Sequence, residues 1–239
     1  MVSKKLTYVL DWKMKKSYLT RAIAHAFLLL TGAIVPVSVI ASDSLPYYES
    51  ADFTPKWIAP DSAELEDFHR IKAFSFVNQD GKEITEQHFA QHIYVANFFF
   101  TTCPGICPMI RSKLSKVQEK FIDDDTINIV SHSIRPTTDT ISMLHDYAKK
   151  NGIVSGKWHL LTGDKDTIYN LARTAYFANE DLGNLQNTND FLHTENVLLI
   201  DKNRHIRGIY NGLNTSSINH LIADIAVLKN ERAESKQGF

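Results

Sequence analysis

Apolar and polar positions along the chain follow two different periods, and these periods place strands and helices from about residue 73 onward. Residues 93–100, "IYVANFFF", form a continuous apolar run of strand length, as expected for a strand buried on both faces. Further along, apolar residues recur every three or four positions, which predicts amphipathic helices. The predicted strands cover residues 73–78, 82–85, 93–100, 127–134, 158–163, 196–201 and 206–212, and the predicted helices cover about 110–121, 141–150, 164–177 and 217–231.

Turn and capping residues separate these elements. The sequence "QDG" at 79–81 predicts a hairpin between the first two strands, and "KNRH" at 202–205 predicts another between the last two. Asp139 and Thr140 can cap the helix that begins at residue 141. Strands that alternate with helices and then end in a hairpin plus a helix predict a mixed sheet covered on both faces. We therefore expect an α/β protein with a thioredoxin-like three-layer fold.

The N-terminal region has a different composition from the rest. Residues 22–41 contain no Asp, Glu, Lys or Arg and follow the basic stretch "MKKSYLTR", which predicts an export signal, either cleaved after Ala41 or kept as a membrane anchor. The expected location is the periplasm or the periplasmic face of the inner membrane. The predicted organisation is a signal peptide or anchor at 1–41, a tether at 42–69, the thioredoxin-like domain at 70–232 and a tail at 233–239.

Composition narrows the possible functions. A hydrophobic content of 44% is enough for an ordinary buried core. Because 26 basic residues balance 27 acidic ones, no overall field attracts nucleic acid, and we expect no nucleic-acid partner. The chain has two cysteines, which are too few for a scaffold held together by disulfides.

Both cysteines, Cys103 and Cys107, lie in "TTCPGICPM", where a predicted strand passes into a helix. Unpaired N–H groups and the positive end of the helix dipole favour thiolates there, so we expect both pKa values to fall. The spacer is one residue longer than in Cys-x-x-Cys, which lets the sulfurs spread around a metal ion. Soft thiolates select Cu(I), zinc or an iron–sulfur cluster, and one pair of cysteines cannot complete a Cys₄ site. Cu(I) held with one imidazole fits best, while a structural disulfide and a redox-active Cys103–Cys107 pair stay open.

The third ligand has to come from elsewhere in the chain. Among ten histidines, His193 is distinctive because it ends a long polar stretch and lies just before the strand at 196–201. In thioredoxin-like folds, the segment before this strand usually holds a cis-proline and lies opposite the cysteine turn. Most of the other histidines are expected to be surface or core residues.

Around these residues the sequence resembles the Sco/SenC family of copper metallochaperones for cytochrome c oxidase. The likeness rests on "VANFFFTTCPGICPMI", "SHSIRPTTDTISMLHDYAKKNG", "KWHLLTGDKDTIYNLARTAY" and "FLHTENVLLIDKNRHIRGIYNG". Together these blocks span roughly residues 70–225, which is nearly all of the predicted exported domain.

The resemblance implies a site and a role. Cys103 and Cys107 resemble the family's thiolate ligands and His193 its imidazole ligand for copper, as Cu(I) or Cu(II). Asp139 matches a downstream aspartate, and Asp190 lies close to the histidine in sequence, so both are expected near the ligands. The implied role is a metallochaperone, not an enzyme, that delivers copper to the binuclear copper centre of cytochrome c oxidase subunit II. Another copper chaperone or a thioredoxin-like reductant is a possible further partner, as is the membrane if the N-terminal segment is uncleaved.

The chain departs from the family at two positions. Arg135 stands where the family usually has aspartate, and Leu192 stands where an aspartate usually precedes the histidine. An alternative function uses the same cysteines: a thiol-disulfide oxidoreductase that reduces the oxidase subunit or other exported proteins. A thiol peroxidase is disfavoured because Phe100 occupies the position where such sites have threonine.

Overall fold

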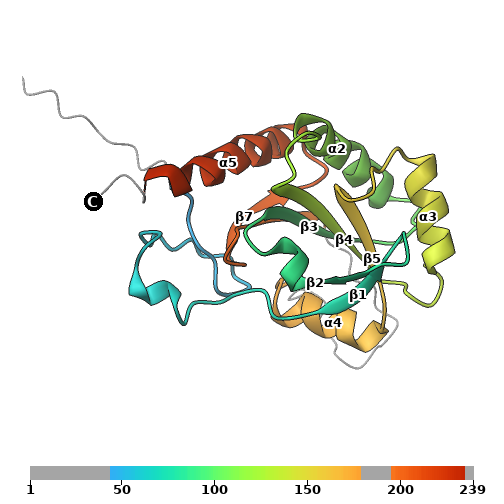
Figure 1. Cartoon of the computed structure of the whole chain (residues 1–239), viewed down its shortest axis with the longest axis horizontal. Helices are drawn as coiled ribbons and strands as arrows, with labels where there is room; N and C mark the ends of the chain where they lie inside the picture. Colours follow the sequence, from blue (N-terminus) through green and yellow to red (C-terminus); the bar gives the residue numbers. More distant parts are fainter. Residues whose placement is uncertain (1–43, 179–194, 235–239) are drawn as a thin grey trace, which may run out of the picture. The chain divides into compact units, whose positions relative to one another are not determined.

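A seven-stranded sheet forms the centre of the computed structural model, which describes residues 44–178 and 195–234 (Figure 1). The strand order across the sheet is β2-β1-β5-β4-β3-β6-β7. The strands are β1 (Ser75–Asn78), β2 (Glu83–Thr85), β3 (Ile93–Phe99), β4 (Ile127–Ser133), β5 (Trp158–Thr162), β6 (Asn196–Ile200) and β7 (Ile206–Asn211).

Strands β3, β4 and β5 run parallel to one another, and the remaining pairs are antiparallel. The mixed sheet and both predicted hairpins are therefore confirmed. Every residue of these three parallel strands is buried, which explains the continuous apolar run of β3 in the sequence. Phe99 pairs with Ser133, so β3 and β4 end at the same edge of the sheet.

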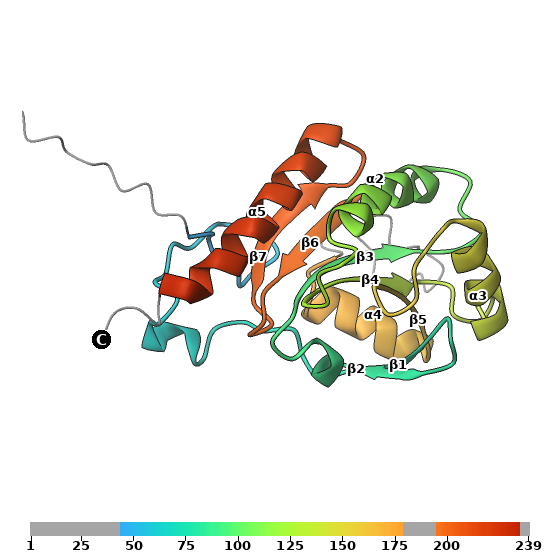
Figure 2. The ribbon, with the colours of Figure 1, turned by 45° about the horizontal axis from the view of Figure 1, so that its top comes forward.

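Helices cover both faces of the sheet, as the three-layer prediction requires. Figures 1 and 2 show α2 and α5 on one face and α4 on the other. The α-helices are α2 (Ile106–Lys120), α3 (Ile141–Lys150), α4 (Lys165–Thr174) and α5 (Thr215–Glu234), and two short 3-10 helices, η1 (Ala63–Leu65) and η2 (Glu86–Phe89), lie in the connections.

The N-cap of α3 and the C-terminal end of α4 differ from the predicted ones. Thr140 alone caps α3, because its hydroxyl accepts a hydrogen bond from the backbone N–H of Met143 at 3.3 Å, while Asp139 makes other contacts. Helix α4 ends at Thr174, three residues before the predicted end. Phe177 has a φ of +51°, a left-handed conformation that an α-helix cannot contain.

The tether predicted at 42–69, of which the structure describes residues 44–69, is irregular but packs against the sheet. Tyr47 is buried and exchanges two backbone hydrogen bonds with Lys56, at 2.8 and 2.9 Å. The Arg207 guanidinium on β7 donates to the carbonyl oxygens of Leu45 at 2.6 Å and Pro46 at 3.1 Å. The same guanidinium lies 3.8 Å from the centre of the Tyr47 ring. These contacts fix the segment to the domain by its backbone.

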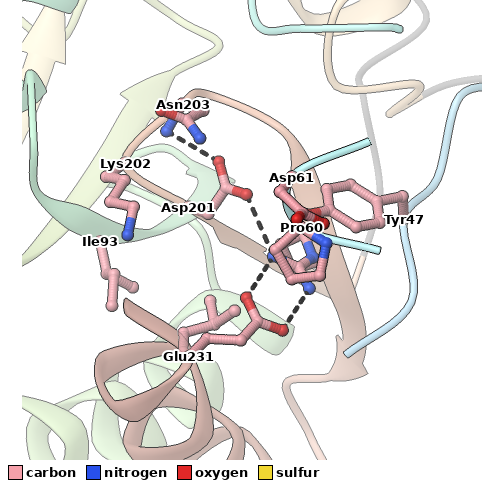
Figure 3. A pocket seen from close by; sticks show the side chains of 10 residues that line it. Tyr47, Pro60, Asp61, Ile93, Asp201, Lys202, Asn203 and Glu231 are labelled. Carbon is pink, nitrogen blue, oxygen red and sulfur yellow. Dashed lines mark hydrogen bonds and ion pairs between the residues drawn. The ribbon is translucent and has the colours of Figure 1, made fainter. Parts of the chain in front are cut away.

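Two carboxylates hold Arg207 in place. Glu231 on α5 accepts two hydrogen bonds from the guanidinium, at 2.7 and 2.8 Å, and Asp201 accepts one at 3.2 Å (Figure 3). A pocket of about 260 Å³ lies beside this cluster. Ile93, the first residue of β3, also lines the pocket, so the pocket lies at the edge of the sheet opposite the cysteines. Other lining residues are Tyr47, Pro60, Asp61, Lys202 and Asn203.

Candidate metal centre

The two cysteines lie where β3 passes into α2, as predicted. Cys103 is half-buried in the turn, and its backbone N–H donates to the Phe100 carbonyl at 3.3 Å. Cys107 lies in the first turn of α2, with 8% of its surface exposed. Both are free thiols, and their side chains are hydrogen-bonded to each other. Gly105 precedes α2 and provides no side-chain cap, so backbone N–H groups of this turn hydrogen-bond Cys103.

The pKa values of the two thiols shift in opposite directions. Partial burial works to raise the pKa of Cys103, but hydrogen bonds from the Cys107 thiol and from the N–H groups of Cys107, Gly105 and Ile106 outweigh it, so the pKa is lowered. Burial raises the pKa of Cys107 to about 12, and its hydrogen bond to Cys103 adds to the rise. The prediction that both pKa values fall is therefore wrong for Cys107, because burial of its sulfur outweighs the helix N-terminus.

Asp139 fixes the chain just before the cysteine turn. Its fully buried carboxylate accepts hydrogen bonds from the Thr101 hydroxyl at 2.5 Å, the Thr101 backbone N–H at 3.2 Å and the Ser133 hydroxyl at 2.5 Å. These bonds connect the end of β4 to a residue two positions before Cys103. In the described contacts Asp139 therefore orients the turn and does not touch a sulfur.

Arg135, which stands where the family usually has aspartate, lies close to the residue that precedes the same turn. Its guanidinium carbon is 4.7 Å from the centre of the Phe100 ring. Its backbone N–H donates to the Ser133 hydroxyl at 3.1 Å. A cation therefore lies next to the segment that carries Cys103, where a carboxylate was expected from the family.

A small cavity of about 10 Å³ lies behind Cys107, and the sequence analysis did not identify it. Arg111 and Tyr147 line it together with Cys107. Burial raises the pKa of Tyr147, and the Arg111 guanidinium, which is hydrogen-bonded to the tyrosine, opposes the rise. Arg111 follows Cys107 by four residues on α2, a spacing that places both on one helix face and could have revealed this pair. The rest of the lining consists of polar, aromatic and aliphatic residues: Asn97, Phe99, Ser131, Ile153, Trp158 and Leu160.

The remaining predicted site residues, His193 and Asp190, lie outside the described residues. Within residues 44–178 and 195–234, no three His, Cys, Asp or Glu side chains come together in a group that could hold a metal ion. The described part of the chain therefore brings together two of the three predicted ligands, Cys103 and Cys107, and places Asp139 behind the turn that carries them.

Comparison with known proteins establishes the family of this chain. Residues 62–230 match the sequence profile of the SCO1/SenC family. The chain belongs to the SCO1/SenC family. The match covers the whole sheet and the cysteine turn, so the resemblance inferred from the sequence blocks is confirmed. The thioredoxin-like fold of SCO1/SenC proteins is also confirmed by solved structures.

Three solved SCO1/SenC structures have the same architecture. A SCO1/SenC family lipoprotein from Bacillus anthracis str. Ames is 24% identical, with a TM-score of 0.59 over 67% of this chain and 95% of that protein. The protein BsSco, described as having a disulfide switch and as a member of the Sco family of cytochrome c oxidase assembly proteins, is 24% identical, with a TM-score of 0.57 over 66% and 92% of the two chains. Arabidopsis thaliana ScoI, solved with copper bound, is 25% identical, with a TM-score of 0.52 over 65% and 97%.

Membrane association was a prediction from the N-terminal residues 22–41, which lie outside the described ranges. Within the ranges that are described, none of the helices has both the length and the apolar composition needed to span a membrane. Helix α5, the longest of those described, has twenty residues, and it carries the charged residues Asp224, Lys229 and Glu231.

Proposed function

We propose that this SCO1/SenC protein is a copper metallochaperone that delivers copper to the binuclear copper centre of cytochrome c oxidase subunit II. The observation that supports the proposal is the placement of Cys103 and Cys107, two free thiols hydrogen-bonded to each other at a strand–helix junction. The Arabidopsis relative was solved with copper bound, and BsSco is a member of a family of oxidase assembly proteins.

Copper is the cargo in this proposal, and the ligands are two thiolates and one imidazole. Cys103 and Cys107 supply the soft sulfurs that select copper, and His193 is the third ligand that the family resemblance implies. Copper has to displace the proton of the buried Cys107 thiol, whose pKa is raised to about 12. Binding therefore releases protons, and the affinity for copper falls as the pH falls.

The proposed order of ligand exchange during copper transfer depends on the unequal exposure of the two thiols. Cys103 is half-buried and faces the turn, while Cys107 lies beneath it. A thiolate of the acceptor can therefore enter beside Cys103 before the bond to Cys107 breaks. This order keeps the copper bound to sulfur throughout the exchange and out of contact with water.

The site of action is proposed to be outside the cytoplasm, in the periplasm or on the periplasmic face of the inner membrane. Residues 22–41 have the composition of an export signal or anchor. The B. anthracis relative is a lipoprotein, which agrees with a membrane-associated protein of this family. Export would place the thiols where oxidation competes with copper binding.

A copper titration of the reduced full chain tests the proposal. We expect one tightly bound copper ion per chain, and at least about tenfold weaker binding, or 1.4 kcal/mol, in His193→Ala and Cys103→Ser. His145→Ala is the matched control, because His145 is an exposed histidine on α3, and its affinity should equal that of the wild type. Wild-type affinity in His193→Ala would contradict the proposed ligand set.

A second candidate function is thiol-disulfide exchange, and the asymmetry of the thiols favours it. The Cys103 thiolate would attack a partner disulfide, forming a mixed disulfide and releasing one partner thiolate. Cys107 would then lose its proton and attack Cys103, which releases the second partner thiol and leaves a Cys103–Cys107 disulfide. The partner gains two electrons and this chain loses two. Full exchange activity in His193→Ala, with unchanged copper affinity, would favour this function over the first.

A further inference from the structure

The cation Arg111 shares a cavity with the buried thiol of Cys107. Arg111 follows Cys107 by four residues on α2, so the two side chains lie on one face of the helix. Both line the cavity of about 10 Å³ behind Cys107, and residues of β3, β4, β5 and α3 close the rest of it. A cavity of this size holds no more than about one water molecule. Little solvent therefore separates the Arg111 side chain from the buried sulfur.

Tyr147 on α3 holds the Arg111 guanidinium at this cavity. The guanidinium is hydrogen-bonded to the tyrosine hydroxyl, and the same hydroxyl interacts electrostatically with the sulfurs of Cys107 and Cys103. The Tyr147 ring packs against Phe99 of β3, with the ring centres 5.7 Å apart. The tyrosine therefore has a fixed position, and its hydrogen bond keeps the cation near the pair of sulfurs.

No carboxylate neutralises Arg111 in the part of the chain that the structure describes. None of the ion pairs found there includes Arg111. The first turn of α2 contains no Asp or Glu. Asp139, which orients the cysteine turn, uses its carboxylate to accept hydrogen bonds from Thr101 and Ser133. The positive charge of Arg111 is therefore available to the thiol pair.

The charge of the proposed copper complex depends on the valence of the ion. Two thiolates leave a bound Cu(I) ion with an excess negative charge, whereas they neutralise a bound Cu(II) ion, and a neutral imidazole ligand does not alter this count. An excess charge next to a buried sulfur is unfavourable unless an opposite charge lies nearby. A cation behind Cys107 therefore stabilises the Cu(I) complex more than the Cu(II) complex.

We infer that Arg111 is a specificity-determining residue that makes the thiol site prefer Cu(I) over Cu(II), an inference that deepens the proposed function and rests on it. Arg111 does not bind the ion. Its guanidinium, held by Tyr147, offsets the excess negative charge of Cu(I) bound to the sulfurs of Cys103 and Cys107. It contributes little to a divalent ion at the same sulfurs, because that complex carries no excess charge. The charge count needs the two thiolates alone, so the preference does not depend on which residue is the third ligand.

The test compares a monovalent and a divalent ion bound to the reduced full chain under argon. Cu(I) is titrated in competition with a coloured Cu(I) chelator, and Zn(II) is the divalent probe because it has no redox chemistry and cannot oxidise the thiols. We expect Arg111→Met to weaken Cu(I) binding by roughly fivefold and to leave Zn(II) binding within about twofold of wild type. The Cu(II)/Cu(I) potential of the copper-loaded variant should fall accordingly by about 40 mV, at 59 mV per tenfold change.

Two further variants separate charge from shape. Arg111→Lys keeps the positive charge and should recover most of the Cu(I) affinity. Lys116→Met is the matched control, because it removes a positive charge from an exposed position on the same helix. Its affinities for Cu(I) and Zn(II) should both equal those of the wild type.

The outcomes separate this inference from the proposed function. Equal weakening of Cu(I) and Zn(II) binding in Arg111→Met would show a structural role and overturn the inference, and so would an unchanged Cu(I) affinity, while copper binding by the wild type would still support the chaperone. Unchanged affinity in His193→Ala would contradict the proposed ligand set and leave a selective loss of Cu(I) in Arg111→Met as support for the inference. A wild-type chain that bound no Cu(I) would overturn both.

Discussion

The buried imidazole of His132 makes the stability of this protein depend on pH. His132 lies on β4 with no exposed surface, and neither ring nitrogen has a hydrogen-bond partner in the described part of the chain. Aromatic rings surround it, with centres 5.4–5.8 Å away: Phe74, Phe76, Phe98 and Tyr176. Burial lowers the pKa of His132 to about 3, from an ordinary value of 6.5.

The size of the effect follows from proton linkage. Below pH 6.5 the unfolded chain binds a proton at His132 that the folded chain does not, so this contribution to stability is complete above pH 6.5 and is lost as the pH falls towards 3. Within that window, a fall of one pH unit lowers the free energy of unfolding by about 1.4 kcal/mol. Between pH 8 and pH 5 the free energy of unfolding should therefore fall by about 2 kcal/mol because of His132 alone.

The variant His132→Phe removes this dependence and two unsatisfied polar atoms. Removing the two buried nitrogens, which have no hydrogen-bond partner, should stabilise the fold by about 1–3 kcal/mol, and the strain of fitting a larger ring offsets part of this gain. We therefore expect the variant to be at least as stable as wild type at pH 8. At pH 5 the variant should have gained a further advantage of about 2 kcal/mol.

Urea unfolding at pH 5, 6, 7 and 8, followed by fluorescence of the buried Trp158, measures both quantities. Burial also lowers the pKa of His159, to about 4, so the wild-type curve contains more than one histidine and only the difference between variants isolates His132. His145→Phe is the control, because His145 is exposed. If His132→Phe loses as much stability as wild type between pH 8 and pH 5, the reasoning is refuted.

Three further predictions follow from the contacts around the site and the N-terminal segment. Iodoacetamide at pH 8 should alkylate Cys103 at least about tenfold faster than Cys107, because only Cys103 has a lowered pKa and partial exposure. Mass spectrometry measures the two rates. Equal rates would contradict the difference in pKa and exposure between the two thiols. Asp139→Asn should lower the free energy of unfolding by about 1.5–3 kcal/mol and speed alkylation of Cys103, because the charged hydrogen bonds of Asp139 hold the cysteine turn. An unchanged alkylation rate would show that Asp139 does not orient the turn. Arg207→Met should lower the free energy of unfolding in urea by about 3–5 kcal/mol, because it leaves two buried carboxylates without their cation. The same variant should be cleaved faster by proteases near residue 45. The control Lys56→Met, at an exposed ion pair, should change the free energy of unfolding by less than about 1 kcal/mol. A small effect at Arg207 would mean that the segment is held by other contacts.

The local sequence pattern was enough to predict a segment's structure where its neighbours in sequence are also its neighbours in space. The apolar run at 93–100 is buried along its whole length in β3 because both faces of that strand are covered. The turns at 79–81 and 202–205 close hairpins whose strands adjoin in the chain. The same locality predicted a thiol pair at the head of α2.

Tertiary structure alone decided the properties that depend on residues far apart in sequence. The opposite acidities of Cys103 and Cys107 arise because burial under the rest of the fold outweighs the local helix dipole at Cys107. Asp139 looked like a helix cap, yet its carboxylate bonds Thr101, which is 38 residues away. Arg207 holds a backbone segment about 160 residues before it. Solvent exclusion and long-range hydrogen bonding form only when the layers assemble, so no sequence period records them.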